Sequence, residues 1–344
     1  MGGLSRTLNP SHASNGGSSM WKQRGVSAVG PLAVTDQAPA TCKLVYILGA
    51  GHCGSTLLSR LLGEVPGFFN AGEAGRHLFA QETAEAQKAP CGCGQSAGQC
   101  DFWSEIVSGV SPQVRSYWKW ARRSRFLKFQ AFIPSLQMQL SRSLQGERHS
   151  RSGLAEVASS MATTYERIRK KANGKIVVDS SKDGIMAAML SATHRIELYF
   201  IQLIRHPYGV VSSYGRPKTG ARAASMLECI LTKCWYDYLR FELVKRRAYW
   251  YRTLLYEDLV RNPTAVIHGL AEQITGTRVE LSFMRGKVAA LGLQHDLEGN
   301  PRVPRSGSLE IRQGEGQLSA WRRSAIWLTT FPLLWRYGYF SRRA

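Results

Sequence analysis

The sequence is short of acidic residues and lacks any long apolar run. It has 24 Asp and Glu residues against 45 Lys and Arg residues, a formal net charge of +21. This excess favours anionic partners, without choosing among nucleotides, sulfated or phosphorylated substrates, nucleic acid and an acidic membrane face. No apolar run reaches the roughly 18 residues that cross a bilayer. The N-terminus also lacks a hydrophobic signal segment, so a cytoplasmic location is the expectation.

The chain is nevertheless long and apolar enough to fold. Its 344 residues, 44% of them hydrophobic, can bury the core of one large domain. Residues 1–40 differ, because they are rich in Gly, Ser and Ala and contain no acidic residue before Asp36. We expect residues 1–40 to form a disordered tail, with an organelle transit peptide as the alternative, and residues 41–344 to form the folded domain.

Short apolar strands alternate with helical patterns after residue 41. The predicted strands are residues 43–48, 175–179, 196–204 and 251–256, and the predicted helices include one with Leu57, Leu58, Leu61 and Leu62 on one face and one that begins at Pro263. Near-continuous apolar strands of this kind form parallel sheets. The sequence therefore predicts an α/β fold, a parallel sheet flanked by helices. The basic residues 111–171 are expected to form a helical insertion or lid.

A glycine-rich loop follows the first predicted strand. Residues 49–56, GAGHCGST, match the phosphate-binding pattern G-x-x-x-x-G-K-[ST] except that Ser55 replaces the lysine. Such a loop offers backbone N–H groups and the positive end of a helix to an anion, whatever its side chains are. In nucleoside triphosphatases the lysine reaches the outer phosphates, so its absence suits a ligand with less charge at that end. A tight turn without a ligand is the structural alternative.

A second anion-binding signal lies at the end of the strand at 196–204. Arg205 follows that strand directly, Pro207 favours a helix start, and Ser212 and Ser213 lie on the predicted helix. Ligands of open α/β sheets bind at the carboxyl ends of the strands, where an arginine can grip a phosphate with two parallel hydrogen bonds. A surface ion pair is the alternative for Arg205 taken alone.

These two segments resemble the sulfotransferases that use 3′-phosphoadenosine 5′-phosphosulfate (PAPS). GHCGST is similar to their 5′-phosphosulfate loop, and RHPYGVVSS to their 3′-phosphate motif. NAGE, VVDSSKD, LLYEDLVRNP and GNPRVPRSG continue the resemblance in family order from about residue 43 to about residue 340. The match is to bacterial-type enzymes and, more distantly, to tyrosylprotein sulfotransferases. It departs from the family at His52, where a Lys or Arg is usual, and at His206, where an Asp is usual.

The resemblance implies a P-loop-like sulfotransferase fold and a set of site residues. Glu73 is the expected base on the acceptor, and Lys182 and His52 are expected to offset charge on the transferred group and the departing nucleotide. The residues expected to bind the donor are Gly51, His52, Cys53, Gly54, Ser55, Thr56, Arg205, Ser213 and Arg302. PAPS is the implied sulfuryl donor and no metal is required. The acceptor is a hydroxyl, or an amine, on a carbohydrate, lipid, peptide or small molecule.

Three cysteines lie close together in the stretch CGCGQSAGQCDFW. Cys91, Cys93 and Cys100 could bind zinc with a fourth ligand or form a disulfide, although their spacing is not the usual C-x-x-C pair. The stretch also resembles one found in bacterial sulfotransferase-like proteins, which implies a structural loop near the acceptor site.

Two other functions remain as alternatives. A P-loop nucleotide kinase or triphosphatase would use Asp179 to bind magnesium, but the missing lysine argues against it. A non-catalytic protein that binds nucleic acid or a membrane surface would use the aromatic and basic residues at 118–129 and 321–340. Solvated helix faces explain the first stretch, and a C-terminal helix packed on the core and kinked at Pro332 explains the second. We therefore expect no nucleic-acid partner and leave peripheral membrane contact open.

Overall fold

The computed structural model describes residues 42–123, 154–191, 193, 195–215, 225–245, 249–313 and 318–340. The predicted N-terminal tail and the central part of the predicted insertion lie outside these residues. Five parallel strands form the main sheet in the order β2-β3-β1-β4-β5. They are β1 (Cys42–Leu48), β2 (Phe68–Gly72), β3 (Ile176–Asp179), β4 (Ile196–Ile204) and β5 (Trp250–Leu255). The predicted α/β class with a parallel sheet is confirmed.

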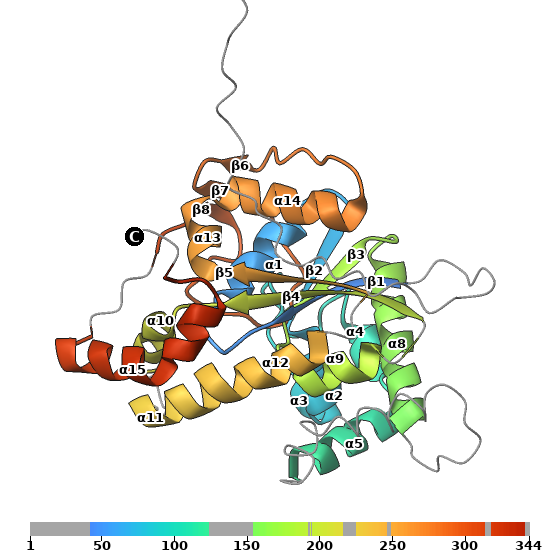
Figure 1. Ribbon diagram of the computed structural model, residues 1–344. Coiled ribbons are helices and arrows are strands. Elements are labelled where there is room, and N and C mark those ends of the chain that lie inside the picture. The colour runs from blue at the N-terminus through green and yellow to red at the C-terminus, as the bar shows by residue number, and fades with distance from the viewer. Residues whose placement is uncertain are drawn as a thin grey trace, which may run out of the picture. The chain divides into compact units, whose positions relative to one another are not determined.

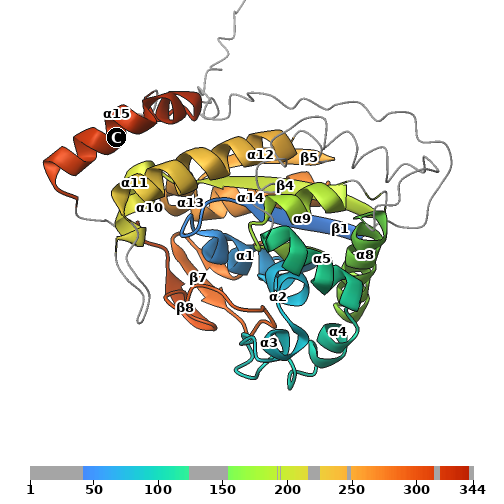
Figure 2. The same ribbon diagram turned by 90° about the horizontal axis from the view of Figure 1, so that it is seen from below.

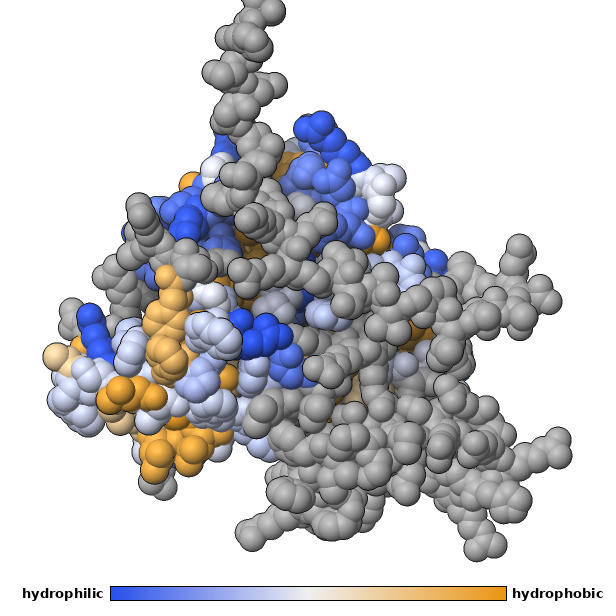
Figure 3. Space-filling view, in the orientation of Figure 1, coloured by the Kyte–Doolittle hydropathy of each residue, from blue (hydrophilic) through white to orange (hydrophobic). Residues whose placement is uncertain are grey.

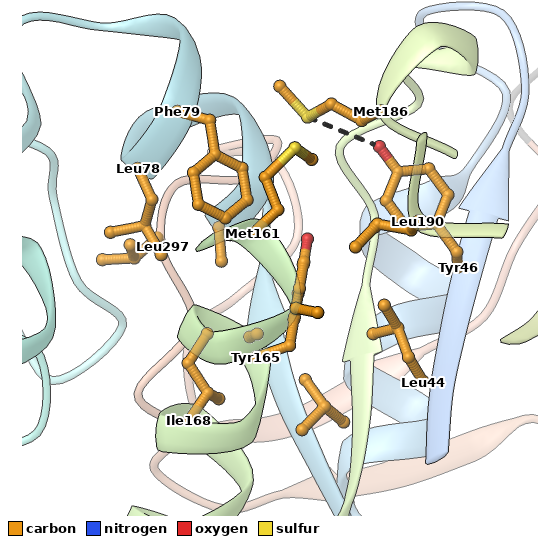
Figure 4. Close-up of a cluster of buried hydrophobic side chains, with 14 of the residues drawn as sticks. Leu44, Tyr46, Leu78, Phe79, Met161, Tyr165, Ile168, Met186, Leu190 and Leu297 are labelled. Atoms are coloured by element: carbon orange, nitrogen blue, oxygen red, sulfur yellow. Dashed lines mark hydrogen bonds between the residues drawn. The ribbon is translucent and has the colours of Figure 1, made fainter. Parts of the chain in front are cut away.

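Both faces of the main sheet are buried, which explains why its strands contain so few polar residues. Along β1, Leu44 and Tyr46 face one hydrophobic cluster, whereas Val45 and Ile47 face the other. Figure 4 shows part of the first cluster, where Tyr46 donates a hydrogen bond to the sulfur of Met186 at 3.9 Å. A strand buried on both faces requires helices on both sides.

Helices cover the two faces of the sheet as Figure 1 shows, and Figure 2 shows the second face from below. On the first face lie α1 (Ser55–Gly63), α13 (Tyr256–Arg261) and α14 (Pro263–Thr275). On the second lie α2 (Ala74–Ala80), α8 (Leu154–Lys171), α9 (Gly184–Ser191) and α12 (Asp237–Lys245). The predicted leucine face of α1 is buried. Helix α14 begins at Pro263 as predicted, with Asn262 accepting the N–H of Ala265 at 3.3 Å as its N-cap.

The remaining elements are shorter or lie at the edges of the sheet. The helices are α3 (Thr83–Gln87), α4 (Ser104–Ser108), α5 (Pro112–Arg123), α10 (Pro207–Tyr214), α11 (Met226–Glu228), the π-helix η1 (Cys229–Tyr236) and α15 (Ala320–Arg336). A small antiparallel sheet contains β6 (Met284–Arg285), β7 (Val288–Leu291) and β8 (Gly307–Glu310). Helices α5 and α8 form the described ends of the predicted insertion, and α8 packs on β1 and β3.

Helix α15 packs on the rest of the protein through only part of its surface. Its buried residues are Ile326, Thr330, Leu333 and Leu334, and Pro332 lies inside the helix. Trp321 and Trp335 are exposed. Figure 3 shows hydrophobic side chains gathered on the face where α11 and α15 lie. Among the described residues, every helix is too short or too polar to cross a membrane.

Candidate active site

The glycine-rich loop joins the end of β1 to the start of α1. Its backbone turns sharply, because His52 and Gly54 both have positive φ angles, of 63° and 99°. A Cβ atom on Gly54 would also lie 2.4 Å from the ring of Tyr256, so both the conformation and the packing require glycine there. Gly54 is the N-cap of α1 and has no side chain that could cap the helix. The first N–H groups of α1 are therefore suited to bind an anion.

Most of the residues predicted to form the site line one cavity of about 480 Å³. They are Gly51, His52, Gly54, Ser55, Thr56, Glu73, Lys182, Arg205, Ser213 and Arg302. Cys53 is the exception, since its side chain is fully buried in the hydrophobic cluster beside α1. Its N–H group donates to the carbonyl of Ala50 at 3.1 Å. The structure therefore brings all the predicted site residues except Cys53 to this cavity.

Lys182 connects the predicted base to the glycine-rich loop. It lies after β3 with a positive φ of 62°. Its Nζ atom donates to Oε1 of Glu73 at 2.6 Å, to Oγ of Ser55 at 3.2 Å and to the carbonyl of Ser180 at 2.8 Å. A single ammonium group thus contacts the first side chain of α1 and the side chain that directly follows β2.

Glu73 is a buried carboxylate with two cationic neighbours. Its exposed fraction is 7%. Burial by itself raises the pKa of Glu73, but Lys182 and Arg76 outweigh burial and hold that pKa below its ordinary value. The Nη1 atom of Arg76 lies 2.9 Å from Oε2 of Glu73. Glu73 is therefore ionised at neutral pH, which is the form that a general base requires. Sequence reasoning missed Arg76, although its place one helical turn after Glu73 was a usable signal.

Arg205 lies at the end of β4, beside the loop. Its Nη1 atom donates to the carbonyl of His52 at 2.8 Å, and its guanidinium lies 4.6 Å from the centre of the Tyr256 ring. Ser213, on α10, lines the same cavity. Arg205 and Ser213 therefore line the same cavity.

His206, which stands where the sequence resemblance led us to expect an Asp, caps the start of α10. Its Nδ1 atom accepts the N–H of Tyr208 at 3.2 Å, as an N-cap of α10. Burial lowers the pKa of His206 to about 4, so the ring is neutral at neutral pH and can accept this bond. An aspartate at an N-cap would accept the same kind of hydrogen bond. A histidine can therefore serve as the N-cap at this position.

A loop from the C-terminal part of the chain forms another wall of the cavity. The N–H of Asn300 donates to Oγ1 of Thr56 at 3.1 Å, and Arg302 is exposed at the cavity's edge. The loop is held by a buried ion pair in which Nη2 of Arg60 lies 3.1 Å from Oδ2 of Asp296. Glu298 and Asn300 also line the cavity and were not predicted as site residues, although Asn300 lies in the GNPRVPRSG stretch beside Arg302.

Asp179 does not contribute to the cavity and is fully buried. Its carboxylate accepts hydrogen bonds from the N–H of Gly75 at 2.8 Å, the N–H of Ser181 at 2.7 Å and the hydroxyl of Tyr165 at 2.9 Å. The residue that a magnesium-dependent kinase would need is therefore already bonded to neutral donors in the protein interior.

Comparisons with known proteins found distant likenesses only. No family model and no curated protein matches the chain. The sulfotransferase domain from the curacin biosynthetic pathway has a TM-score of 0.48 and 14% identity, covering 87% of this chain and 98% of that one. The sulfotransferase domain of the Synechococcus PCC 7002 olefin synthase has a TM-score of 0.39 and 17% identity, covering 71% and 77%. Sulfotransferase STF9 from Mycobacterium avium has a TM-score of 0.39 and 13% identity, covering 86% and 77%. Likenesses this distant assign no function, which has to be inferred from the site.

Proposed function

We propose that this protein is a sulfotransferase that moves the sulfuryl group of PAPS to a hydroxyl, or an amine, of an acceptor. The observation that carries the proposal is the contact of Lys182 with both Glu73 and Ser55 inside the cavity. Through this contact, the ammonium group of Lys182 and the carboxylate of Glu73 lie next to the loop that is predicted to bind an anion. The absence of the P-loop lysine and the buried position of Asp179 favour sulfuryl transfer over magnesium-dependent phosphoryl transfer.

The donor would be held at its two charged ends. Ser55, Thr56 and the first N–H groups of α1 would bind the 5′-phosphosulfate. Arg205 and Ser213 would bind the 3′-phosphate, with Arg302 at the edge of the cavity as a further cation. The cavity of about 480 Å³ lies within the usual size range of small-molecule sites.

The chemistry would begin at Glu73, which takes the proton of the acceptor hydroxyl. The acceptor oxygen then forms a bond to sulfur while the bond from sulfur to the bridging oxygen breaks, and that electron pair leaves with the nucleotide phosphate. Lys182 would stabilise negative charge on the transferred group, and His52 would donate to the bridging oxygen. Glu73 is bound to Lys182 in the free protein, so a bound sulfuryl group that attracts Lys182 would also release the base.

Calorimetric titration with 3′,5′-adenosine bisphosphate tests the donor site. We expect this nucleotide to bind equally well with and without magnesium, and ATP to bind weakly under both conditions. Magnesium-dependent binding of ATP, with none of the bisphosphate, would instead support a kinase or triphosphatase. Binding of neither nucleotide, together with binding to RNA or to anionic vesicles, would support the non-catalytic alternative.

Transfer of radiolabelled sulfate from PAPS tests the reaction and identifies the acceptor class. A screen of carbohydrates, lipids, tyrosine peptides and small hydroxylated compounds should yield a labelled product with one of them. Glu73→Gln should then reduce turnover by about 100-fold or more and leave bisphosphate affinity nearly unchanged. Unchanged turnover, with chemistry rate-limiting, would exclude Glu73 as the base.

A further inference from the structure

Four side chains that commonly bind metals converge outside the cavity. They are Cys91, Cys93, Cys100 and His295, and their ligand atoms all lie within 4.8 Å of one another. The cysteines come from one short segment, whereas His295 lies 195 positions after Cys100. None of the four lines the cavity. The fold has therefore built this cluster from two distant parts of the sequence, separately from the proposed active site.

The distances within the cluster fit a tetrahedral zinc site. Zinc–sulfur bonds of about 2.3 Å and zinc–nitrogen bonds of about 2.05 Å place tetrahedral ligands about 3.8 Å apart for two sulfurs and about 3.6 Å for sulfur and nitrogen. The Sγ atom of Cys100 lies 3.7 Å from those of both Cys91 and Cys93. The Nδ1 atom of His295 lies 3.2 Å from Sγ of Cys100 and 3.9 Å from Sγ of Cys91.

A disulfide explains the cluster less well. All seven cysteines of the chain are described, and each is a free thiol. The Sγ separations of 3.7 Å far exceed the roughly 2.05 Å of a disulfide bond. One disulfide would also use only two of the three thiols and would give His295 no function. A metal uses all four groups.

The surrounding backbone brings the two segments together closely. A Cβ atom on Gly92 would lie 2.1 Å from Oδ1 of Asp296, so only glycine permits this approach. The N–H of Gly92 donates to the carbonyl of Asp296 at 2.8 Å. The ring of Phe102 stacks on the imidazole of His295, with 5.7 Å between ring centres. The imidazole is thus oriented by packing as well as by its neighbours in the sequence.

The charge around the cluster also suits a metal–thiolate group. Three thiolates and a neutral imidazole around one divalent zinc ion carry a net charge of −1. The guanidinium of Arg305 donates to the carbonyl of Cys91 at 3.1 Å, which brings a positive charge to the same segment. Thiolates with imidazole in a tetrahedral arrangement favour zinc over magnesium or calcium, which prefer oxygen ligands.

We propose that Cys91, Cys93, Cys100 and His295 bind one zinc ion as a structural site. Four protein ligands leave no open position for a substrate or water, unlike a catalytic zinc site. This site is compatible with a donor that needs no metal, and it does not depend on the proposed function.

The zinc ion would fix the segment that supports the base. The residues after His295 contact the end of β2, because Leu297 accepts the N–H of Glu73 at 2.8 Å and donates to the carbonyl of Ala71 at 3.1 Å. Glu298 then lines the cavity. Binding of the metal at His295 would therefore anchor both the backbone of Glu73 and the start of the loop that carries Arg302.

Metal analysis of the full chain, produced without a histidine tag in zinc-supplemented medium, tests the proposal. We expect about one zinc per chain after gel filtration in metal-free buffer, and intense visible absorption of tetrahedral cobalt–thiolate when cobalt replaces zinc. Zinc below about a tenth of an ion per chain, iron in its place, or a disulfide found among these cysteines by mass spectrometry of the unreduced protein would each overturn it. These measurements use the parent chain and do not depend on a variant that folds.

Substitutions then locate the site. Cys93→Ser and His295→Ala should each lower the zinc content at least about tenfold, whereas His295→Cys, which restores a thiolate, should keep about one ion. Cys42→Ser is the matched control, because Cys42 lies outside the cluster and donates to the carbonyl of Tyr165. Full zinc content in both Cys93→Ser and His295→Ala would place the metal elsewhere and refute this site.

Discussion

The ion pair of Lys182 and Glu73 permits a prediction that needs no ligand. The exposed fractions of their side chains are only 16% and 10%, and Nζ lies 2.6 Å from Oε1. Lys182→Met removes the ammonium group and retains a flexible apolar chain. Glu73 then keeps a single cationic partner among those described, Arg76, whose side chain is 51% exposed. The variant should therefore be destabilised by a carboxylate that is buried and only partly compensated.

The magnitude follows from the burial of the pair. Removing one partner of a buried ion pair costs about 3 to 5 kcal/mol, because the other charge stays desolvated. Arg76 remains in contact with Glu73 and compensates part of its charge, so we expect a smaller loss, about 2 to 3 kcal/mol in the free energy of unfolding. Arg76→Met is the matched control, since it removes an exposed cation from the same carboxylate and should cost about 1 kcal/mol or less.

Urea unfolding of four proteins measures the coupling: the parent, Lys182→Met, Glu73→Gln and the double variant. We expect the two substitutions to be non-additive by about 1 to 3 kcal/mol at pH 7. The pKa of Glu73 in the folded protein lies below its ordinary value of 4.5, so the stabilisation is present above that value and is lost as the pH falls through the lower, folded pKa. The difference between the parent and Lys182→Met should shrink over the same range.

Two results would refute this reasoning. Additive effects of Lys182→Met and Glu73→Gln at pH 7 would show that the two side chains do not interact energetically. A loss for Lys182→Met no greater than that for Arg76→Met would show that solvent, and not Lys182, compensates the carboxylate.

Three further predictions concern side chains in or next to the cavity. Arg205→Ala should weaken binding of 3′,5′-adenosine bisphosphate by about 30- to 1,000-fold in calorimetry, because the 3′-phosphate loses a charged partner. Arg195→Ala, which lies outside the cavity, is the control and should leave this affinity unchanged. An unchanged preference for the 3′-phosphorylated nucleotide in Arg205→Ala would exclude Arg205 as the 3′-phosphate ligand. His206→Asn should flatten the acid side of the stability profile. The pKa of His206 falls from 6.5 in the unfolded chain to about 4 in the folded protein, so between these pH values only the unfolded chain binds the proton. The free energy of unfolding of the parent should therefore fall by about 2 to 3 kcal/mol from this group as the pH drops from 6.5 to 4. Equal pH profiles of stability for the two proteins would contradict this. His52→Arg should shift the alkaline decline of turnover upward by about one pH unit or more, because imidazole loses its proton near neutrality and guanidinium does not; identical profiles would remove His52 from the mechanism.

The regular part of the fold could be predicted because its signals are local. The apolar residues 43–48 and the leucines of α1 each encode an element through their own periodicity. The sheet of β6, β7 and β8 was not predicted, because β6 has only two residues and β8, with the sequence GSLE, has no apolar run. The buried pair of Arg60 and Asp296 was equally inaccessible, since 236 positions separate the two residues.

The site shows the same limit at the level of single residues. Ser55, Arg205 and Ser213 belong to motifs whose spacing fixes where they lie relative to a strand end. His295 belongs to no motif, and its contact with Cys100 depends on how the chain after β7 returns to the 91–100 segment. The three cysteines alone therefore left zinc and a disulfide open, and the fourth ligand became visible only in the fold.

The contacts of the cavity in the free protein bear on how it could bind an anion. Lys182, Arg205 and Thr56 each bond to other cavity-lining residues, which are Glu73, His52 and Asn300. These bonds hold the donors in place before any ligand arrives, so little side-chain entropy remains to be lost on binding. The bonds also resist binding, because an anion must compete with the Glu73 carboxylate for Lys182. On the proposed function, this competition links binding of the sulfuryl donor to activation of Glu73. The sulfuryl group attracts Lys182 away from Glu73, and its transfer then requires that Glu73 be free to act as the base.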